Sequence, residues 1–344
     1  MRTLLLSLAL VSCGDGRTEL GTIRDIATLD SGRDSGSCMD TVLATDPTGA
    51  TALALGGTHV FWGTTDGQLW TREQGNASEV AKEPSAIVAI AVDAASIFFA
   101  SGPTIFSGPR GISVITPLAD KQGQPSYLAV DDQAVYFIDY GSGIAAGRLM
   151  RVDKSTKVVT ALMNGLDTPS GLAMDDTDLW VTASLALTPN GAAQGALLRI
   201  PKAGRGVGQV VLQGLHDPKR LAVDASSVVF LEQDFGGQRG GVRKVPKTGA
   251  SGATSIADTG SELALDITLD ATNAYVTTLT GSGATQHGVV RRIALDGSKN
   301  EVWATAPSQV FYTVIRNDKD AVYWTSGWPT PAPSGTPSVQ KKCK

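Results

Sequence analysis

Leu128-Ala129-Val130-Asp131 and the nearby Val135-Tyr136-Phe137 form the stretch of sequence that decides the fold. A small-apolar run ends in Asp, and a β-branched or aromatic trio follows after a short gap. Each run has the length of a short strand, and Asp between two such runs is typical of a tight turn because its carboxylate caps the neighbouring backbone. The stretch therefore predicts a β-hairpin in which Asp131 has a structural role in the turn and the trio packs in the core.

The same pattern recurs along the chain at steps of 37 to 49 residues. Periods of roughly 40–50 residues with several strands per unit are typical of β-propellers. The position of the turn Asp is occupied by Gly in the first unit and by Asp in the others. Its seven occupants are Gly56, Asp93, Asp131, Asp175, Asp224, Asp270 and Asp318.

Most units continue with two further strands. In the third unit these are Gly147 to Val152 and Val158 to Ala161, and similar segments follow the later hairpins. Neighbouring blades must bury each other's faces because a single four-stranded blade cannot bury both of its own. We therefore expect an all-β fold, a seven-bladed β-propeller of four-stranded antiparallel blades, over residues 38–344.

The two ends of this domain are expected to meet. The last unit has residues for three strands only, whereas Asp40 to Thr45 reads as a fourth strand with no blade of its own. Pairing that strand with the C-terminal strand, at Val339 to Lys344, would remove two open edges. Cys38 and Cys343 would then flank one hairpin, where a disulfide could form in an oxidising compartment. The alternative is that both are free buried cysteines.

The N-terminus carries an export signal. Met1-Arg2 is followed by an apolar stretch from Leu4 to Val11, typical of a secretory signal. Leu10-Val11-Ser12-Cys13 resembles a bacterial lipobox, and this resemblance implies cleavage before an acylated Cys13. Gly14 after the cysteine implies, by the same resemblance, the outer membrane. The alternative is a plain secretion signal with an incidental cysteine.

The domain plan is thus a lipoprotein signal peptide at 1–12, a flexible tether at 13–37 and the propeller at 38–344. The tether has few large apolar groups and cannot bury enough surface to order itself. We expect an exported lipoprotein of the bacterial cell envelope that contacts the membrane through its lipid anchor only, because no apolar run is long enough to span a bilayer.

Composition excludes some partners. The chain has 18% charged residues and a formal net charge of −4, with no basic stripe, so nucleic acid is not an expected partner. Its three histidines, His59, His216 and His287, are too scattered to suggest a metal site. We expect no cofactor, no metal and a monomeric protein.

Val322-Tyr323-Trp324-Thr325 and the run from Val290 to Ser298 resemble the YWTD-type propellers of low-density-lipoprotein receptors. The chain is also similar to propeller lipoproteins of bacteria. The resemblance covers residues 40–344 as architecture, although the YWTD motif is complete in no unit and Ser326 replaces its Asp. These families imply a binding function.

The innermost strands offer one candidate site. Four residues before each turn position the units carry Ala52, Ala89, Tyr127, Gly171, Arg220, Asp266 and Val314. Arg220 and Asp266 fall in adjacent units at one level. They are expected to form a partly buried structural ion pair or to hold a polar ligand. His216, Asp217 and Lys219 lie just before Arg220.

The second candidate region is the set of connections between second and third strands, which are short in the first two units and long in the rest. Long loops on one face are a usual binding region, although any one residue there can be an ordinary solvated side chain. The exposed candidates in these loops are Asp139, Tyr140, Glu232, Asp234, Phe235, Arg239, His287 and Trp328.

These patterns favour a non-catalytic protein that binds a protein, peptide or glycan on its long-loop face. The residues that we predict to contact the ligand are Arg220, Asp266, His216, Glu232, Asp234, Phe235, Tyr140 and Trp328. No catalytic motif is present. The alternative is a hydrolase or lyase acting in the central funnel. Calcium-dependent propeller lactonases use acidic and Asn side chains there, but only Asp266 and Glu262 resemble such a set.

Overall fold

A computed structural model describes residues 40–45, 48–73, 75–111, 114–142, 145–185, 194–204, 208–233, 240–249, 252–327 and 337–344. All of them belong to one compact unit, Ser35–Lys344. Within these ranges the chain is almost entirely β-strand, and the single helical segment is the 3₁₀ turn η1 (Gly283–Thr285). No helix in the same ranges is long and apolar enough to cross a membrane.

Five of the sheets have four antiparallel strands each. The first contains β2 (Ala50–Gly56), β3 (His59–Thr64), β4 (Gln68–Arg72) and β5 (Ser78–Lys82). The second contains β6 (Ile87–Val92), β7 (Ser96–Ser101), β8 (Thr104–Pro109) and β9 (Thr116–Ala119). Two later sheets contain β17 (Pro218–Val223), β18 (Ser227–Glu232), β19 (Gly240–Pro246) and β20 (Thr254–Gly260), then β21 (Leu263–Leu269), β22 (Asn273–Thr280), β23 (His287–Ala294) and β24 (Asn300–Thr305). The last contains β25 (Phe311–Asn317), β26 (Ala321–Gly327), β27 (Ser338–Cys343) and β1 (Thr41–Thr45).

The remaining seven strands form one continuous sheet. They are β10 (Pro125–Val130), β11 (Ala134–Asp139), β12 (Gly147–Asp153), β13 (Val159–Met174), β14 (Asp178–Leu185), β15 (Gln194–Pro201) and β16 (Gln209–Leu215). The sequence predicts two separate strands where the 16-residue β13 runs unbroken. One half of β13 pairs with β12 and the other half with β14, so this strand serves two repeat units.

The turn role predicted for the Asp positions is confirmed. Asp131 Oδ1 accepts hydrogen bonds from the backbone N–H groups of Gln133 (3.0 Å) and Ala134 (2.9 Å), and the other turn aspartates do the same. In the first sheet, where glycine occupies the turn position, the residue with positive φ is the one after it. Gly57, with φ 63°, adopts the left-handed conformation that favours glycine, not Gly56.

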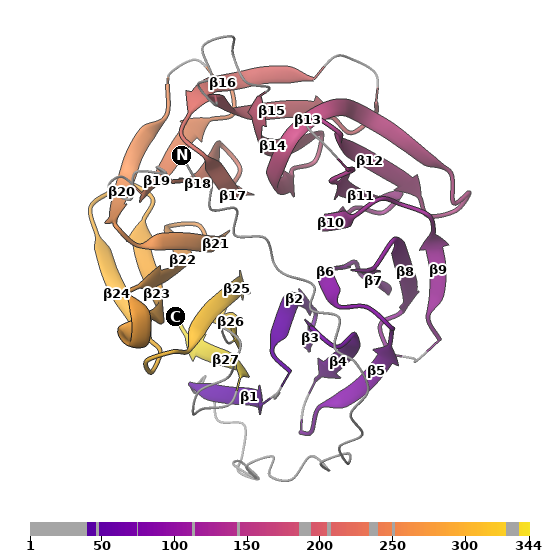
Figure 1. The fold of residues 1–344 in the computed structure, drawn as a ribbon, viewed down its shortest axis with the longest axis horizontal. Helices are drawn as coiled ribbons and strands as arrows, with labels where there is room; N and C mark the ends of the chain where they lie inside the picture. Colours follow the sequence, from indigo (N-terminus) through magenta and orange to yellow (C-terminus); the bar gives the residue numbers. More distant parts are fainter. Residues whose placement is uncertain are drawn as a thin grey trace. The chain divides into compact units, whose positions relative to one another are not determined.

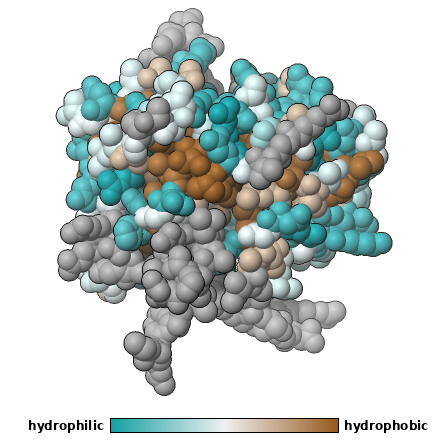
Figure 2. Space-filling model, turned by 90° about the horizontal axis from the view of Figure 1, so that it is seen from above, coloured by the Kyte–Doolittle hydropathy of each residue, from teal (hydrophilic) through white to brown (hydrophobic). Residues whose placement is uncertain are grey.

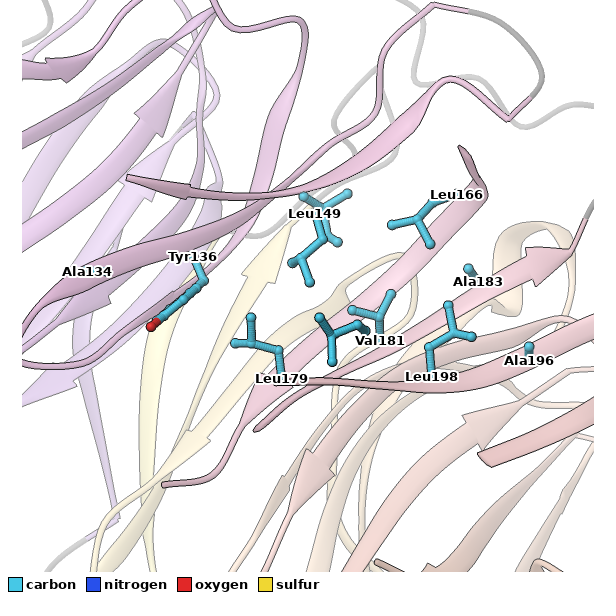
Figure 3. Packing of buried hydrophobic residues seen from close by; sticks show 11 residues of the cluster. Ala134, Tyr136, Leu149, Leu166, Leu179, Val181, Ala183, Ala196 and Leu198 are labelled. Atoms are coloured by element: carbon cyan, nitrogen blue, oxygen red, sulfur yellow. The ribbon is translucent and has the colours of Figure 1, made fainter. Parts of the chain in front are cut away.

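The sheets of this unit lie around a common centre (Figure 1). The first strands of successive sheets contact one another in the order β2, β6, β10, β13, β17, β21 and β25, and β25 also contacts β2. Apolar clusters fill the space between neighbouring sheets. In one of them, Tyr136 and Leu149 pack against Leu179, Val181 and Leu198 (Figure 3). This arrangement of repeated sheets is a β-propeller.

The two terminal strands are neighbours. β1 pairs antiparallel with β27, with Val42 opposite Gln340, and Asp40 Oδ1 accepts a hydrogen bond from the Cys343 N–H at 3.0 Å. Cys343 lies opposite Ala321, as Asp153 lies opposite Ala134, so the two residues hold equivalent positions in their units. Cys38 and Cys13 lie outside the described residues.

Some apolar side chains remain on the surface. Val42, Val210 and Val302 are exposed on the outermost strands β1, β16 and β24. Figure 2 shows apolar residues grouped between hydrophilic ones on one side of the molecule. Single exposed valines on strands are normal and do not indicate a binding site.

Candidate binding site at the inner strands

Asp266 on β21 is the centre of the candidate site. Its Oδ2 atom accepts hydrogen bonds from Arg316 Nη1 (2.7 Å) and from the Ile315 N–H (3.1 Å) of the neighbouring sheet. Only 6% of its side chain is exposed. The predicted partner, Arg220, approaches Oδ1 with its Nε atom at 3.9 Å, which is too far for a hydrogen bond. The main partner of Asp266 is therefore Arg316.

Arg220 is held mainly by an aromatic ring. Its guanidinium lies 4.0 Å from the ring centre of Tyr127 on β10, and 33% of the side chain remains exposed. The Tyr140 hydroxyl donates a hydrogen bond to the Tyr127 hydroxyl at 3.0 Å. Burial, with a smaller effect of Tyr127, raises the pKa of Tyr140 well above its usual range. We call Tyr127, Tyr140, Arg220, Asp266 and Arg316 the inner-strand cluster.

The first strands are irregular where they carry these residues. The pairing of β10 with β11 shifts between Ser126 and Ala129, and Tyr127 in this bulge has φ 51°. A similar shift between Pro218 and Leu221 contains Arg220. Bulges redirect side chains and are frequent beside functional sites, and a bulky residue with positive φ is strained. A shift at the same level occurs in all seven pairings of first with second strands, so these bulges belong to the repeat and set the direction of the side chains that the first strands carry.

Two of the loop residues predicted to be exposed are buried. Glu232 accepts hydrogen bonds from the His216 N–H (2.7 Å) and from Arg243 Nε (2.8 Å). Asp139 is also buried and accepts from the Gln124 N–H at 2.7 Å. These carboxylates brace the chain that enters β10 and β17, and the prediction that Asp139 and Glu232 are exposed is wrong.

Glu262 has a comparable supporting role. Arg291 donates two hydrogen bonds to it, from Nε at 2.7 Å and Nη2 at 2.5 Å, and Thr278 donates a third. Burial raises the pKa of Glu262, but these donors outweigh it and hold the pKa below its ordinary value. Glu262 is therefore an ion-paired carboxylate at neutral pH.

The remaining predicted residues are dispersed. The His216 side chain is exposed, and Nδ1 of the half-buried His287 lies 2.8 Å from the Thr285 carbonyl. Tyr140 follows β11 in a long connection, as predicted, and joins the cluster through Tyr127. Four predicted residues lie outside the described ranges: Asp234, Phe235, Arg239 and Trp328. Within those ranges no three His, Cys, Asp or Glu side chains are grouped so that they could hold a metal ion.

A different arrangement recurs at the turns between first and second strands. There a lysine that follows the third strand of one repeat unit reaches the turn aspartate of the preceding unit. These four ties between units are Lys154–Asp93 (2.5 Å), Lys202–Asp131 (3.1 Å), Lys247–Asp175 (2.9 Å) and Lys344–Asp270 (3.1 Å).

An aromatic donor completes most of these turns. Tyr136 and Tyr275 donate their hydroxyl protons to Asp131 and Asp270, each at 3.0 Å, and the Trp180 indole donates to Asp175 at the same distance. Burial and the adjacent Asp131 raise the pKa of Tyr136 to about 12. The core packing predicted for the aromatic trio is confirmed for these three buried residues, and the hydrogen bonds to aspartate are a second role that was not predicted.

The sequence contained a signal for the ties that the prediction missed. Lys154, Lys202, Lys247 and Lys344 each follow the end of a third strand by one residue. Arg316 had no such signal, because its unit is degenerate and it lies two residues, not four, before the turn position. Its role depends on β25 lying beside β21.

Comparison with known proteins supports the fold assignment. The model of the strictosidine synthase family, a β-propeller family, matches residues 130–187, about a sixth of the chain. No protein of curated function matches the sequence.

Solved structures are similar in fold. The extracellular domain of a candidate one-component system of B. thetaiotaomicron matches with a TM-score of 0.64 at 11% identity, over 88% of this chain and 40% of that chain. A prolyl endopeptidase matches with 0.56 at 12% identity, over 87% and 50%. BamB from Moraxella catarrhalis matches with 0.51 at 14% identity, over 85% of each chain. This chain spans less than half of the first structure. Such identities show the β-propeller fold alone.

Proposed function

We propose that this protein is an exported, lipid-anchored propeller that binds a protein, peptide or glycan at its inner-strand cluster. In this proposal the ring has seven blades, the long strand β13 contributes to two of them, and β1 closes the ring beside β27. The contacts that run from β2 through to β25 and back to β2 support this count.

The observation that carries the binding proposal is the partly exposed side chain of Arg220. It comes from β17, stacks on a tyrosine of β10 and lies near a carboxylate of β21, so residues from three separated segments converge on it. Arg with part of its surface free beside aromatic rings is a frequent anchor in binding sites. The long connections from β11 to β12 and from β18 to β19 follow strand ends close to this cluster.

The binding proposal is tested with peptide and glycan arrays probed with the full protein. We expect ligands whose binding falls in Arg220→Ala by about 1.5 kcal/mol or more. Arg110→Ala is the matched control, since Arg110 lies at the β2–β6 side of the ring among turn residues. Binding that is equal in both variants and the wild type would reject the site.

The anchor is a separate part of the proposal and rests on the sequence from Leu10 to Cys13. An envelope location is consistent with the fold likeness to an extracellular domain. Cys13→Ser should release the protein into the soluble fraction, and a labelled fatty acid should mark the wild type only. A wild-type protein that takes up no label would reject acylation.

We also propose a disulfide between Cys38 and Cys343. Support comes from the hydrogen bond between the Cys343 N–H and Asp40, two residues beyond Cys38. Closing so long a loop would restrict the unfolded chain and add several kcal/mol, about 5–6 by chain entropy. Peptide mapping without reduction should recover the two cysteine peptides linked, and separate peptides would contradict the pairing.

The alternative is a hydrolase or lyase in the funnel, and the match to the strictosidine synthase family over residues 130–187 is the observation in its favour. The charge pairing argues for the binder. Glu232, Glu262 and Asp266 each accept hydrogen bonds from an arginine, and a carboxylate held in this way is a weak general base. The YWTD resemblance also stays a proposal; Tyr323 of that motif donates to Asp318.

A further inference from the structure

The donors of the inner-strand cluster are largely unused. Arg220 makes no hydrogen bond to any described residue, because Asp266 Oδ1 lies 3.9 Å from its Nε. Arg316 uses Nη1 to bind Asp266 and the Ile315 carbonyl, and its other guanidinium nitrogens have no described acceptor. The Tyr127 hydroxyl accepts from Tyr140, so its own proton is available. The cluster therefore offers several N–H and O–H donors.

Acceptors, in contrast, are scarce. Asp266 Oδ2 already accepts two hydrogen bonds, and 94% of the side chain is buried by its neighbours. Two guanidinium groups lie at this one carboxylate, which leaves one positive charge uncompensated within the cluster. About one third of each guanidinium side chain is exposed, 33% for Arg220 and 36% for Arg316.

The nearest other charges do not cancel this excess. Asp217 is paired with Lys219, its two carboxylate oxygens lying 2.7 and 2.8 Å from Nζ. Glu232 is paired with Arg243. A ligand that complements the cluster must therefore bring acceptors and negative charge, and an arginine fork matches the two oxygens of a carboxylate or phosphate.

We infer that the inner-strand cluster binds an oxyanion, a carboxylate or phosphate group of the ligand, between Arg220 and Arg316 with the Tyr127 hydroxyl as a further donor. This inference rests on the proposed binding function and names the chemistry that the ligand presents. Arg220 contacts the anion directly. Asp266 acts as a positioning residue that fixes Arg316.

The test is isothermal titration calorimetry of the full protein with citrate and with inorganic phosphate, at matched ionic strength. We expect saturable binding of at least one anion, weakened roughly tenfold or more in Arg220→Gln. Tyr127→Phe keeps every charge and should weaken binding a few-fold. Arg110→Gln, on an arginine that also lacks a described carboxylate partner, should leave binding unchanged. Binding of citrate alone identifies a carboxylate, and binding of phosphate alone identifies a phosphate.

Two results would overturn the inference: no saturable binding of either anion, or an equal loss in Arg220→Gln and Arg110→Gln. Chemical unfolding of each variant checks that it is folded. If the arrays find a neutral glycan or peptide that depends on Arg220, the proposed function stands and the oxyanion inference fails. If the arrays find no ligand whose binding depends on Arg220, although citrate or phosphate binds, the oxyanion site stands and the proposed binding of a protein, peptide or glycan is rejected.

Discussion

The turns that carry Asp93, Asp131, Asp175 and Asp270 and the inner-strand cluster both bring a carboxylate beside a cation, but they do so differently. At the turns the pair recurs from unit to unit, and the lysine reaches its aspartate within hydrogen-bond distance. At Asp266 the arrangement occurs once, and the exposed Arg220 stays 3.9 Å away. Repetition indicates a part that every blade interface needs, whereas a single, incompletely satisfied cluster indicates a site for another molecule.

The turns differ among themselves, which allows a direct test. Asp175 binds two backbone N–H groups, the Trp180 indole and Lys247. Asp224 binds the backbone of Ser226 and Ser227, and the residue that follows the third strand of the next unit is Leu295 and not lysine. Asp175→Ala should lower the free energy of unfolding by about 2–3 kcal/mol, and Asp224→Ala by about 1 kcal/mol. Urea unfolding measures both. Equal losses would show that the tie between units adds nothing to the turn.

The ties also predict the response to alkaline pH. Burial and the hydrogen bonds to Asp131 and Asp270 raise the pKa values of Tyr136 and Tyr275 to about 12, above the ordinary value of about 10. The stability that these tyrosines add is fully present below pH 10 and is lost as the pH rises toward 12. A Tyr136→Phe, Tyr275→Phe double variant should be less stable at pH 7 and should lose less between pH 9 and 11.5. If the free energy of unfolding of the wild type fell no more steeply over this pH range than that of the double variant, the prediction would be wrong.

The turn aspartates, unlike the tyrosines, lose their contribution to stability at low pH. Burial tends to raise the pKa of Asp175, but Lys247, Trp180 and the turn N–H groups hold it well below its ordinary value. The contribution of this carboxylate is therefore present above about pH 4 and is lost as the pH falls through the lowered pKa. The free energy of unfolding should fall less between pH 7 and pH 2.5 in Asp175→Asn than in the wild type. An unchanged difference would remove Asp175 from the acid response.

The smallest expected effect concerns the first sheet, where Gly56 stands in place of the turn aspartate. A Cβ at Gly56 would lie 3.3 Å from Arg110 Nη1 but 2.5 Å from Val92 Cγ1, so space must be made first. In a Val92→Ala background, Gly56→Asp should raise the free energy of unfolding by about 0.5–1 kcal/mol through a new tie to Arg110. Gly56→Asn in the same background is the control. An equal gain in both would assign the effect to the turn and not to the charge.

The regular parts of this fold were the ones that the sequence predicted well. The Asp-to-trio pattern of Leu128 to Phe137 predicted β10, β11 and the turn between them, because short-range turn chemistry and strand periodicity determine both. The sequence did not predict that the fourth strand of the third unit continues without interruption into the first strand of the next, because this continuity depends on how the two units lie and not on local sequence.

The candidate site was predicted in part for the same reason. Arg220 and Asp266 could be brought to one level by alignment of the repeats, and both join the cluster. The role of Arg316, the stacking of Arg220 on Tyr127 and the burial of Glu232 depend on contacts between units, which no repeat alignment encodes. Alignment of the repeats predicts the features that all blades share, whereas the candidate site consists of residues that differ from blade to blade.

Two cation variants compared in one experiment test the central claim most directly. Lys247→Gln removes a tie between units, and Arg220→Gln removes the exposed cation of the cluster. For each variant the free energy of unfolding and the affinity for citrate and inorganic phosphate are measured together. We predict that Lys247→Gln loses about 1 kcal/mol of stability and keeps anion binding, whereas Arg220→Gln keeps its stability and loses binding roughly tenfold. The reverse pattern, with Arg220→Gln the less stable variant and anion binding intact, would contradict the division between structural ties and a binding cluster.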